Sequence, residues 1–186
     1  MTVLSIEEWP SRILETKSVE VTEFDDDFRQ FVADMHETMD NARGIGLAAN
    51  QVGVAKRVLT IYIPWSGDDE EEGEQRQDWH DVRYTFVNPR ITKRKEKIRW
   101  QEGCLSFPEI FEFVDRSAEV WVEAMDEHGE KFEVHATGLF SVCLQHEIDH
   151  LDGITFMKRV SRLKAGNIRK KMLRRGKLAA RETELT

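Results

Sequence analysis

"LQHEIDHLDG", residues 144–153, predicts a helix with a chemical site on it. The helix begins near Gly138, can end at Gly153, and carries one largely apolar stripe: Leu139, Val142, Cys143, Ile148 and Leu151. His146 and His150 lie one helical turn apart, so both imidazoles can bind one metal ion. Glu147 is within reach of a water on that ion without being a ligand.

Two imidazoles hold a catalytic ion poorly, because open catalytic sites usually have three protein ligands. Beyond His150 there is no histidine, and the remaining carboxylates are few: Asp152, Glu182 and Glu184. Upstream, "QEGCLSFP" (101–108) places Cys104 in an irregular, accessible segment. Cys143 is the alternative thiol, but its apolar setting is typical of a core cysteine. The sequence therefore favours Cys104 as the third ligand.

The residue patterns in the rest of the chain predict helices and antiparallel strands. Apolar periodicity predicts an amphipathic helix over 25–41, whose buried stripe contains Phe28, Phe31, Val32, Met35 and Met39. The glycines of "GIGLAANQVGV" (44–54) suit turns or a close backbone approach. Strand character follows at three places: 56–63, 84–88 ending at Pro89, and an exposed strand at 90–100.

The C-terminal half adds a hairpin and a basic helix. Residues 118–125 and 130–135 alternate in period two around "DEHG" (126–129), where Gly129 suits a tight turn. Ser161 can cap a last helix, about 161–176, which Gly166 interrupts and which ends near Gly176. No βαβ alternation appears. We therefore expect an α+β fold with antiparallel sheets and a C-terminal helix.

Composition limits the architecture and the partners. The 186 residues, 40% of them hydrophobic, predict a single domain over 1–186 with an acidic surface-loop insertion at about 65–83. A net charge of −8 argues against a sequence-specific nucleic-acid binder, although 158–177 is strongly basic. We see no export signal and no apolar run long enough to span a membrane. These features predict a cytoplasmic protein with two reduced cysteines.

With "GIGLAANQ" (44–51), "EGCLS" (102–106) and "QHEIDH" (145–150) in that order, the chain resembles the peptide deformylases, which remove the formyl group from new bacterial polypeptides. The similarity extends over nearly the whole length. Two departures are local: the acidic loop is longer than in the shortest members, and Phe111 and Glu112 stand where relatives often carry a cation. The resemblance implies a mixed α+β domain with the metal-bearing helix at its centre.

The resemblance also implies a role for each residue of the site. Cys104, His146 and His150 would hold one divalent metal, commonly Fe²⁺, with Zn²⁺ or Ni²⁺ as replacements. A water activated by the metal would attack the formyl carbon, and Glu147 would pass the water's proton to the departing amine. The side-chain amide of Gln51 and the backbone N–H of Leu105 would stabilise the oxyanion.

The implied substrates are N-formylmethionyl nascent peptides. Candidates for the methionine pocket are Ile45, Leu139 and Val142, and Gly46 would offer close backbone contact to the peptide. Glu102 and Asp149 can orient the ligand imidazoles, although Asp149 can equally be a salt-bridged helix carboxylate. The basic C-terminal helix can bring such an enzyme to the ribosome, or it can be a solvated amphipathic helix.

Two other functions compete with this one. A zinc endopeptidase with the His-Glu-x-x-His motif needs a downstream ligand that the sequence lacks. A non-catalytic metal-binding module has no use for Glu147 or Gln51. The other four histidines follow no ligand pattern and receive no function: His36, His80, His128 and His135.

Overall fold

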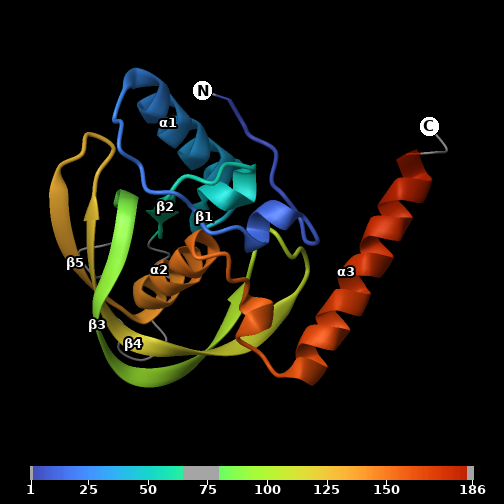
Figure 1. Ribbon diagram of the computed structural model, residues 1–186. Helices are drawn as coiled ribbons and strands as arrows, with labels where there is room; N and C mark the ends of the chain where they lie inside the picture. The colour runs from blue at the N-terminus through green and yellow to red at the C-terminus, as the bar shows by residue number, and fades with distance from the viewer. Residues whose placement is uncertain (1, 65–79, 184–186) are drawn as a thin grey trace.

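The computed structural model describes residues 2–64 and 80–183, with side chains up to residue 176. Figure 1 shows how its elements are arranged. In chain order they are η1 (Arg12–Glu15), α1 (Asp26–Asn41), β1 (Gly46–Ala48), η2 (Ala49–Val52), β2 (Val58–Tyr62), β3 (Arg83–Gly103), β4 (Phe111–Met125), β5 (Lys131–Thr137), α2 (Gly138–Leu151), η4 (Phe156–Lys158) and α3 (Arg162–Thr183).

In the described part of the chain the strands form one antiparallel sheet, in the order β1-β2-β3-β4-β5. Spatial order equals chain order, so each strand pairs with its neighbour in sequence, as expected for an α+β fold. The long strands β3 and β4 bend, and the sheet curves around α2 (Figure 1). The predicted fold class is confirmed, with one curved sheet where the sequence suggested several.

Helix α2 lies inside this curve and is buried from Phe140 to Leu151, polar residues included. Its apolar side chains pack with those of the strands in one core cluster. The helix ends as predicted at Gly153, which has φ +68°. The Gly153 N–H donates to His150 O at 3.0 Å and the Ile154 N–H to Asp149 O at 2.8 Å, which is a Schellman cap. A Cβ at position 153 would lie 2.6 Å from Glu15 O, so glycine is also required for packing.

Helix α1 packs on the sheet at its β1–β2 edge. Asp25 caps it by accepting a hydrogen bond from Phe28 N at 2.8 Å. The stripe predicted from its periodicity packs against β1 and β2, with Phe31 at the edge. The described helices include none that is long and apolar enough to cross a membrane.

Helix α3 stands to one side of the molecule (Figure 1). Its first half docks through Ile168 and Met172 on a cluster that contains Phe107 and Phe156. Ser161 caps it as predicted, since its Oγ accepts from Lys164 N at 3.4 Å. The predicted interruption at Gly166 and end at Gly176 are wrong. A Cβ at either glycine would meet nothing within 4 Å, so packing does not require glycine there, and a glycine costs only about 1 kcal/mol and does not stop a helix.

The strand predictions need three corrections. β3 runs through Pro89 to Gly103 as one strand, because register shifts near Val87 and Ile91 absorb the proline. β4 begins at Phe111, seven residues before the predicted strand at 118. The turn-like segment 44–54 contains the short strand β1 and the 3-10 helix η2.

The hairpin around Gly129 is confirmed, with φ +84° at the glycine. The predicted acidic loop lies largely outside the described residues, since 65–79 are not described and β3 begins at Arg83.

Candidate metal centre

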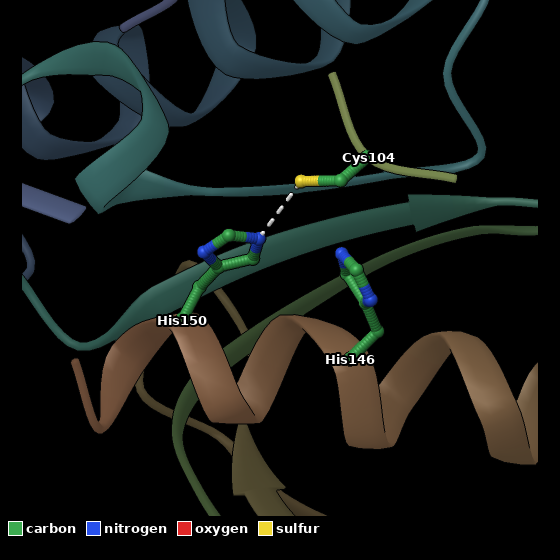
Figure 2. Close-up of side chains that lie close together, drawn as sticks. All are labelled: Cys104, His146 and His150. Carbon is green, nitrogen blue, oxygen red and sulfur yellow. Dashed lines mark hydrogen bonds between the residues drawn. The ribbon is translucent and has the colours of Figure 1, made fainter. Parts of the chain in front are cut away.

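Two distant segments bring a thiol and two imidazoles together. Cys104 follows the last residue of β3, and His146 and His150 project from consecutive turns of α2. Figure 2 shows the three side chains pointing toward one another. One ligand atom from each lies within 4.8 Å of the others, and Cys104 Sγ is 3.2 Å from His150 Nε2. No other group of potential ligands of this kind occurs among the described residues.

The electrostatics of this group suit one cation. Burial alone would lower the pKa of His146, but interactions with Cys104, Glu102 and Glu147 raise it well above its usual value. Burial and then the charge of His146 lower the pKa of His150 well below its usual value. The pocket therefore accepts one positive charge but not two, and a sulfur with two imidazoles is a suitable ligand set for Fe²⁺, Zn²⁺ or Ni²⁺.

Glu102 orients one of the imidazoles. Its Oε2 lies 2.8 Å from His146 Nδ1, which leaves the Nε2 of His146 available to a metal. Arg116 donates to both Glu102 oxygens, at 2.6 and 2.9 Å. Burial would raise the pKa of Glu102, yet hydrogen bonds from Arg116 and His146 lower it to about 2. Glu102 is therefore a fixed anion behind His146, as the sequence suggested.

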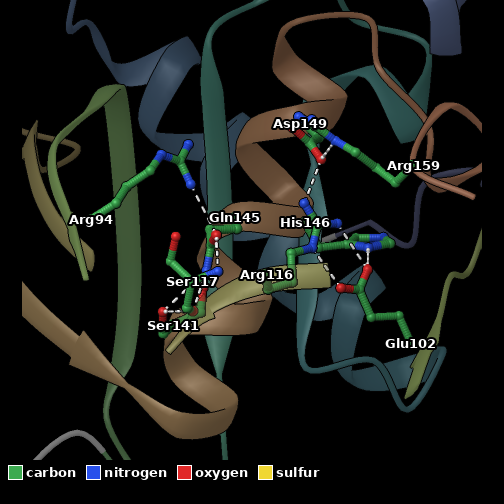
Figure 3. A network of polar contacts seen from close by, with 9 residues as sticks. All are labelled: Arg94, Glu102, Arg116, Ser117, Ser141, Gln145, His146, Asp149 and Arg159. Carbon is green, nitrogen blue, oxygen red and sulfur yellow. Dashed lines mark hydrogen bonds and ion pairs between the residues drawn. The ribbon is translucent and has the colours of Figure 1, made fainter. Parts of the chain in front are cut away.

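Asp149 does not orient an imidazole directly, which was the first of its two expected roles. Arg116 Nη1 donates to its Oδ2 at 2.5 Å, and Arg159 donates to both of its oxygens (Figure 3). Asp149 is thus the salt-bridged carboxylate of the alternative interpretation, and it reaches His146 only through Arg116 and Glu102.

Arg116 is a residue that sequence reasoning missed. Its side chain is 4% exposed, and it occupies an inward position of β4 in the alternation that also buries Val114, Val120 and Val122. A charged residue at an inward position of an otherwise apolar strand face was the available signal, because such a charge needs buried partners.

Glu147 is buried beside this group and its Oε2 has no hydrogen-bond partner among the described residues. Burial raises the pKa of its carboxyl to about 7, although the charge of His146 opposes the shift. Gly46 allows this placement: a Cβ there would lie 2.7 Å from Glu147 Oε1 and 2.7 Å from Cys143 Sγ. The glycine of "GIGLAANQ" thus contacts the glutamate of "QHEIDH".

Gln51 lies on the other side of the thiol. Its Oε1 accepts from Ala48 N at 2.9 Å, and its Nε2 is 3.6 Å from Cys104 Sγ and 3.3 Å from Ser106 Oγ. The first contact fixes the amide so that its N–H groups face the ligands. Ser106 was not singled out by the sequence analysis, although it ends the "EGCLS" motif.

A cavity of about 610 Å³ opens onto this site. Its lining includes most residues expected to touch a substrate or metal: Ile45, Gly46, Gln51, Cys104, Leu105, His146 and Glu147. Leu139 and Val142 are not in its described lining. Leu139 packs against the main core cluster, and Val142 is 3% exposed on α2.

The rival thiol, Cys143, is separate from the metal-ligand group. Its Sγ contacts Ile45 O at 3.6 Å, and burial raises the pKa of this thiol well above its usual value. It is therefore a neutral core cysteine behind the cavity wall, which is the setting that its apolar neighbours predicted.

Comparisons with known proteins agree with this site. The family model described as polypeptide deformylase matches residues 3–166. The peptide deformylase of Neisseria gonorrhoeae is 42% identical over 177 residues, covering 95% of this chain and 98% of that protein. Peptide deformylase 1 of Pseudomonas syringae pv. tomato is 42% identical and covers 97% of this chain and 100% of its own length.

Solved structures extend the likeness to three dimensions. The crystal structure of peptide deformylase from Ehrlichia chaffeensis has a TM-score of 0.84 at 37% identity, covering 94% of this chain and 97% of that one. The same enzyme in complex with actinonin has a TM-score of 0.85 at 39% identity, covering 94% and 98%. With the sequence match spanning most of its length and the metal-ligand group in place, the chain belongs to the polypeptide deformylase family.

Proposed function

We propose that this protein is a metal-dependent hydrolase that removes the N-formyl group from the N-terminal formyl-methionine of newly synthesised polypeptides and releases formate. The convergence of Cys104, His146 and His150 beside the buried Glu147 carries the proposal, because this set is what a metal-assisted hydrolysis requires. The catalytic unit is one domain that spans the whole chain.

Cys104, His146 and His150 would hold the metal, which when bound lowers the pKa of a water molecule and polarises a carbonyl oxygen. Glu147 accepts the proton of the attacking water. As the bond between the formyl carbon and the amine nitrogen breaks, Glu147 donates that proton to the amine. Its pKa of about 7 suits both steps, since the group can gain and lose a proton near neutral pH.

Gln51 and Leu105 stabilise the oxyanion. The fixed Gln51 amide faces the ligand group, and no hydrogen bond among the described residues uses the Leu105 N–H. Each such donor contributes about 3 kcal/mol to the transition state. In this proposal Ile45 and Gly46, which line the cavity, contact the methionine end of the substrate, whereas Leu139 and Val142 are outside the lining and do not touch it.

The formate assay tests this function directly. Formate release from a formyl-methionyl peptide is measured with the metal-loaded protein and with Glu147→Gln, which keeps the shape of the side chain. We expect turnover by the unsubstituted protein and a loss of about 10²-fold or more in the variant at unchanged metal content. Unchanged turnover in the variant would refute the role of Glu147, and absence of formate would refute the activity.

The native metal is Fe²⁺ in this proposal. The three ligands suit several divalent ions, so availability decides which one is bound. Metal analysis after oxygen-free purification should find iron, and exposure to air should then reduce activity, whereas a zinc-loaded sample should keep its activity. Equal loss in both samples would point to oxidation of Cys104 rather than of the metal.

The endopeptidase alternative is not favoured. Of its possible downstream ligands, Asp152 pairs with Arg57 at 2.8 Å. Glu182 belongs to the last part of α3 and Glu184 lies outside the described residues. Cleavage of an unformylated peptide would revive this alternative.

We further propose a cytoplasmic location and contact with the ribosome through α3. Ile168 and Met172 dock this helix on the core, and many of its other described side chains are Lys or Arg. These cationic side chains can bind phosphate groups. Co-sedimentation with ribosomes should weaken when residues 165–186 are deleted and when salt is raised. Binding that is insensitive to the deletion would exclude this role.

A further inference from the structure

A second, smaller cavity of about 370 Å³ lies beside a different face of α2 from the substrate cavity. Four cationic side chains line it: Arg94 and Lys97 from β3, Arg116 from β4, and Arg159 after η4. Two carboxylates, Asp115 and Asp149, share the lining. Figure 3 shows Arg94, Arg116 and Arg159 around the same part of α2.

The positive charges are only partly compensated. Asp149 accepts hydrogen bonds from both Arg116 and Arg159, and Glu102 also pairs with Arg116, so these two guanidinium groups have carboxylate partners. Neither Arg94 nor Lys97 has an ion pair with a carboxylate among the described residues. Burial lowers the pKa of Arg94, and the charges of Arg159 and Arg116 lower it further against the effect of Asp149. An additional anion would relieve this repulsion.

Hydrogen bonds hold the polar side chains that line this cavity in place. Arg94 Nη1 donates to Gln145 Oε1 at 2.9 Å, and the same oxygen accepts from Ser117 N at 2.9 Å. Gln145 Nε2 donates to Ser117 O at 2.9 Å and to Ser141 O at 3.0 Å, so this amide cannot rotate without losing these bonds. The guanidinium of Arg94 is thus held over a buried polar floor, which reduces the entropy lost when it binds a ligand.

We propose that this cavity is a binding site for a small tetrahedral oxyanion, such as sulfate or phosphate. Arg94 and Lys97 provide the uncompensated charge, and Arg159 adds guanidinium hydrogens at the rim. Planar guanidinium groups match the oxygens of such anions through paired hydrogen bonds. The site takes no part in the proposed reaction, although Arg116 of its lining also holds Glu102 behind His146. The carboxylate of Asp115 would repel an anion, so the anion must bind nearer to the cations.

The test uses the full-length, zinc-loaded protein and sulfate, titrated against chloride at constant ionic strength. Nitrogen-detected NMR follows the side chains of Arg94 and Gln145, which line this cavity, and the zinc load is the same at every sulfate concentration. Arg94→Gln removes one uncompensated charge from the cavity. Lys95→Gln is the matched control, because it makes the same change of charge one residue along β3 at a side chain that pairs with Glu119 at 2.8 Å.

We expect saturable shifts of both side chains in the unsubstituted protein. The affinity should fall about tenfold in Arg94→Gln, equal to about 1.4 kcal/mol, and stay unchanged in Lys95→Gln. Lys97→Gln, which breaks no described hydrogen bond, should also weaken binding. Shifts that grow without saturating, or an equal loss in Lys95→Gln, would overturn the proposal.

Discussion

Gly46 links the motifs "GIGLAANQ" and "QHEIDH", because only a residue without a side chain leaves room there for Glu147. Gly46→Ala would place a Cβ 2.7 Å from both Glu147 Oε1 and Cys143 Sγ, so Glu147 must move. We expect kcat for formate release to fall by about 10-fold to 100-fold with metal content unchanged, because a displaced base loses its alignment with the reacting water.

Gly166→Ala is the matched control for this change. Gly166 is half-buried, but nothing lies within 4 Å of a Cβ at that helical position. Activity should be unchanged and the free energy of unfolding should rise by about 0.5–1 kcal/mol. A Gly46→Ala enzyme with normal kcat would mean that Glu147 tolerates movement and does not act as the base.

Glu102 allows a second prediction at this scale. Replacing it by Gln leaves the buried Arg116 with Asp149 as its remaining carboxylate partner and weakens the hold on His146. We expect the free energy of unfolding to fall by about 3 kcal/mol and the metal affinity to fall about 10-fold to 100-fold. Chemical denaturation and competition with a metal chelator measure the two effects.

Glu123→Gln is the comparison for Glu102→Gln, since Glu123 pairs with Arg90 at an exposed site where both side chains are at least 48% exposed. Such surface pairs contribute little to stability, so both quantities should stay close to those of the unsubstituted protein. If Glu102→Gln is equally harmless, the buried network does not position His146.

Sequence reasoning was strongest at this scale where chemistry restricts the choice of residue. The His146 and His150 spacing, and the contrast between the settings of Cys104 and Cys143, indicated which side chains converge. Arg116 could not be placed, because its partners Glu102 and Asp149 come from β3 and α2 and only the folded chain brings them together.

Among the elements, α1 carries a pH-sensitive contact with the sheet. His36 Nε2 lies 3.1 Å from Thr85 Oγ1, and its Nδ1 is buried without a partner among the described residues. Burial, and then the charge of Arg83, lower the pKa of His36 below 6.5, against the opposing charges of Asp40 and Glu127. As pH falls through about 6.5, the unfolded chain takes up this proton before the folded one does, so stability is lost.

We therefore expect His36→Gln to reduce the loss of unfolding free energy between about pH 7.5 and pH 5.5, measured by urea denaturation of the metal-loaded protein. His128→Gln is the control, because that side chain is 60% exposed on the turn between β4 and β5. If the two variants lose stability with pH to the same extent, His36 is not a source of the acid sensitivity.

The elements also show where periodicity misleads. α1, α2 and the hairpin were predictable because their apolar patterns and caps agree locally. β3 was divided at Pro89 because a proline cannot donate to a strand pairing, and the register shift that accommodates it depends on β4. The glycines of α3 suggested breaks, but a long helix with favourable neighbours tolerates them where no packing contact depends on them.

At the scale of the whole molecule, the curved sheet and α2 form a frame that holds the site on rigid elements. Cys104 enters from the end of β3, and both histidines come from the buried helix that the sheet surrounds (Figures 1 and 2). Composition and the absence of βαβ alternation predicted the α+β class. The curvature that brings β3 to α2 could not be predicted, because it arises from the pairing of two long strands.

The central claim is that one sulfur and two imidazole nitrogens share a metal ion. X-ray absorption spectroscopy of the zinc-loaded protein measures this directly, together with Cys104→Ser and Cys143→Ser samples. We expect one sulfur and two imidazoles in the unsubstituted protein and in Cys143→Ser, and no sulfur in Cys104→Ser. A sulfur that persists in Cys104→Ser, or an unsubstituted protein whose metal has no sulfur neighbour, would contradict it.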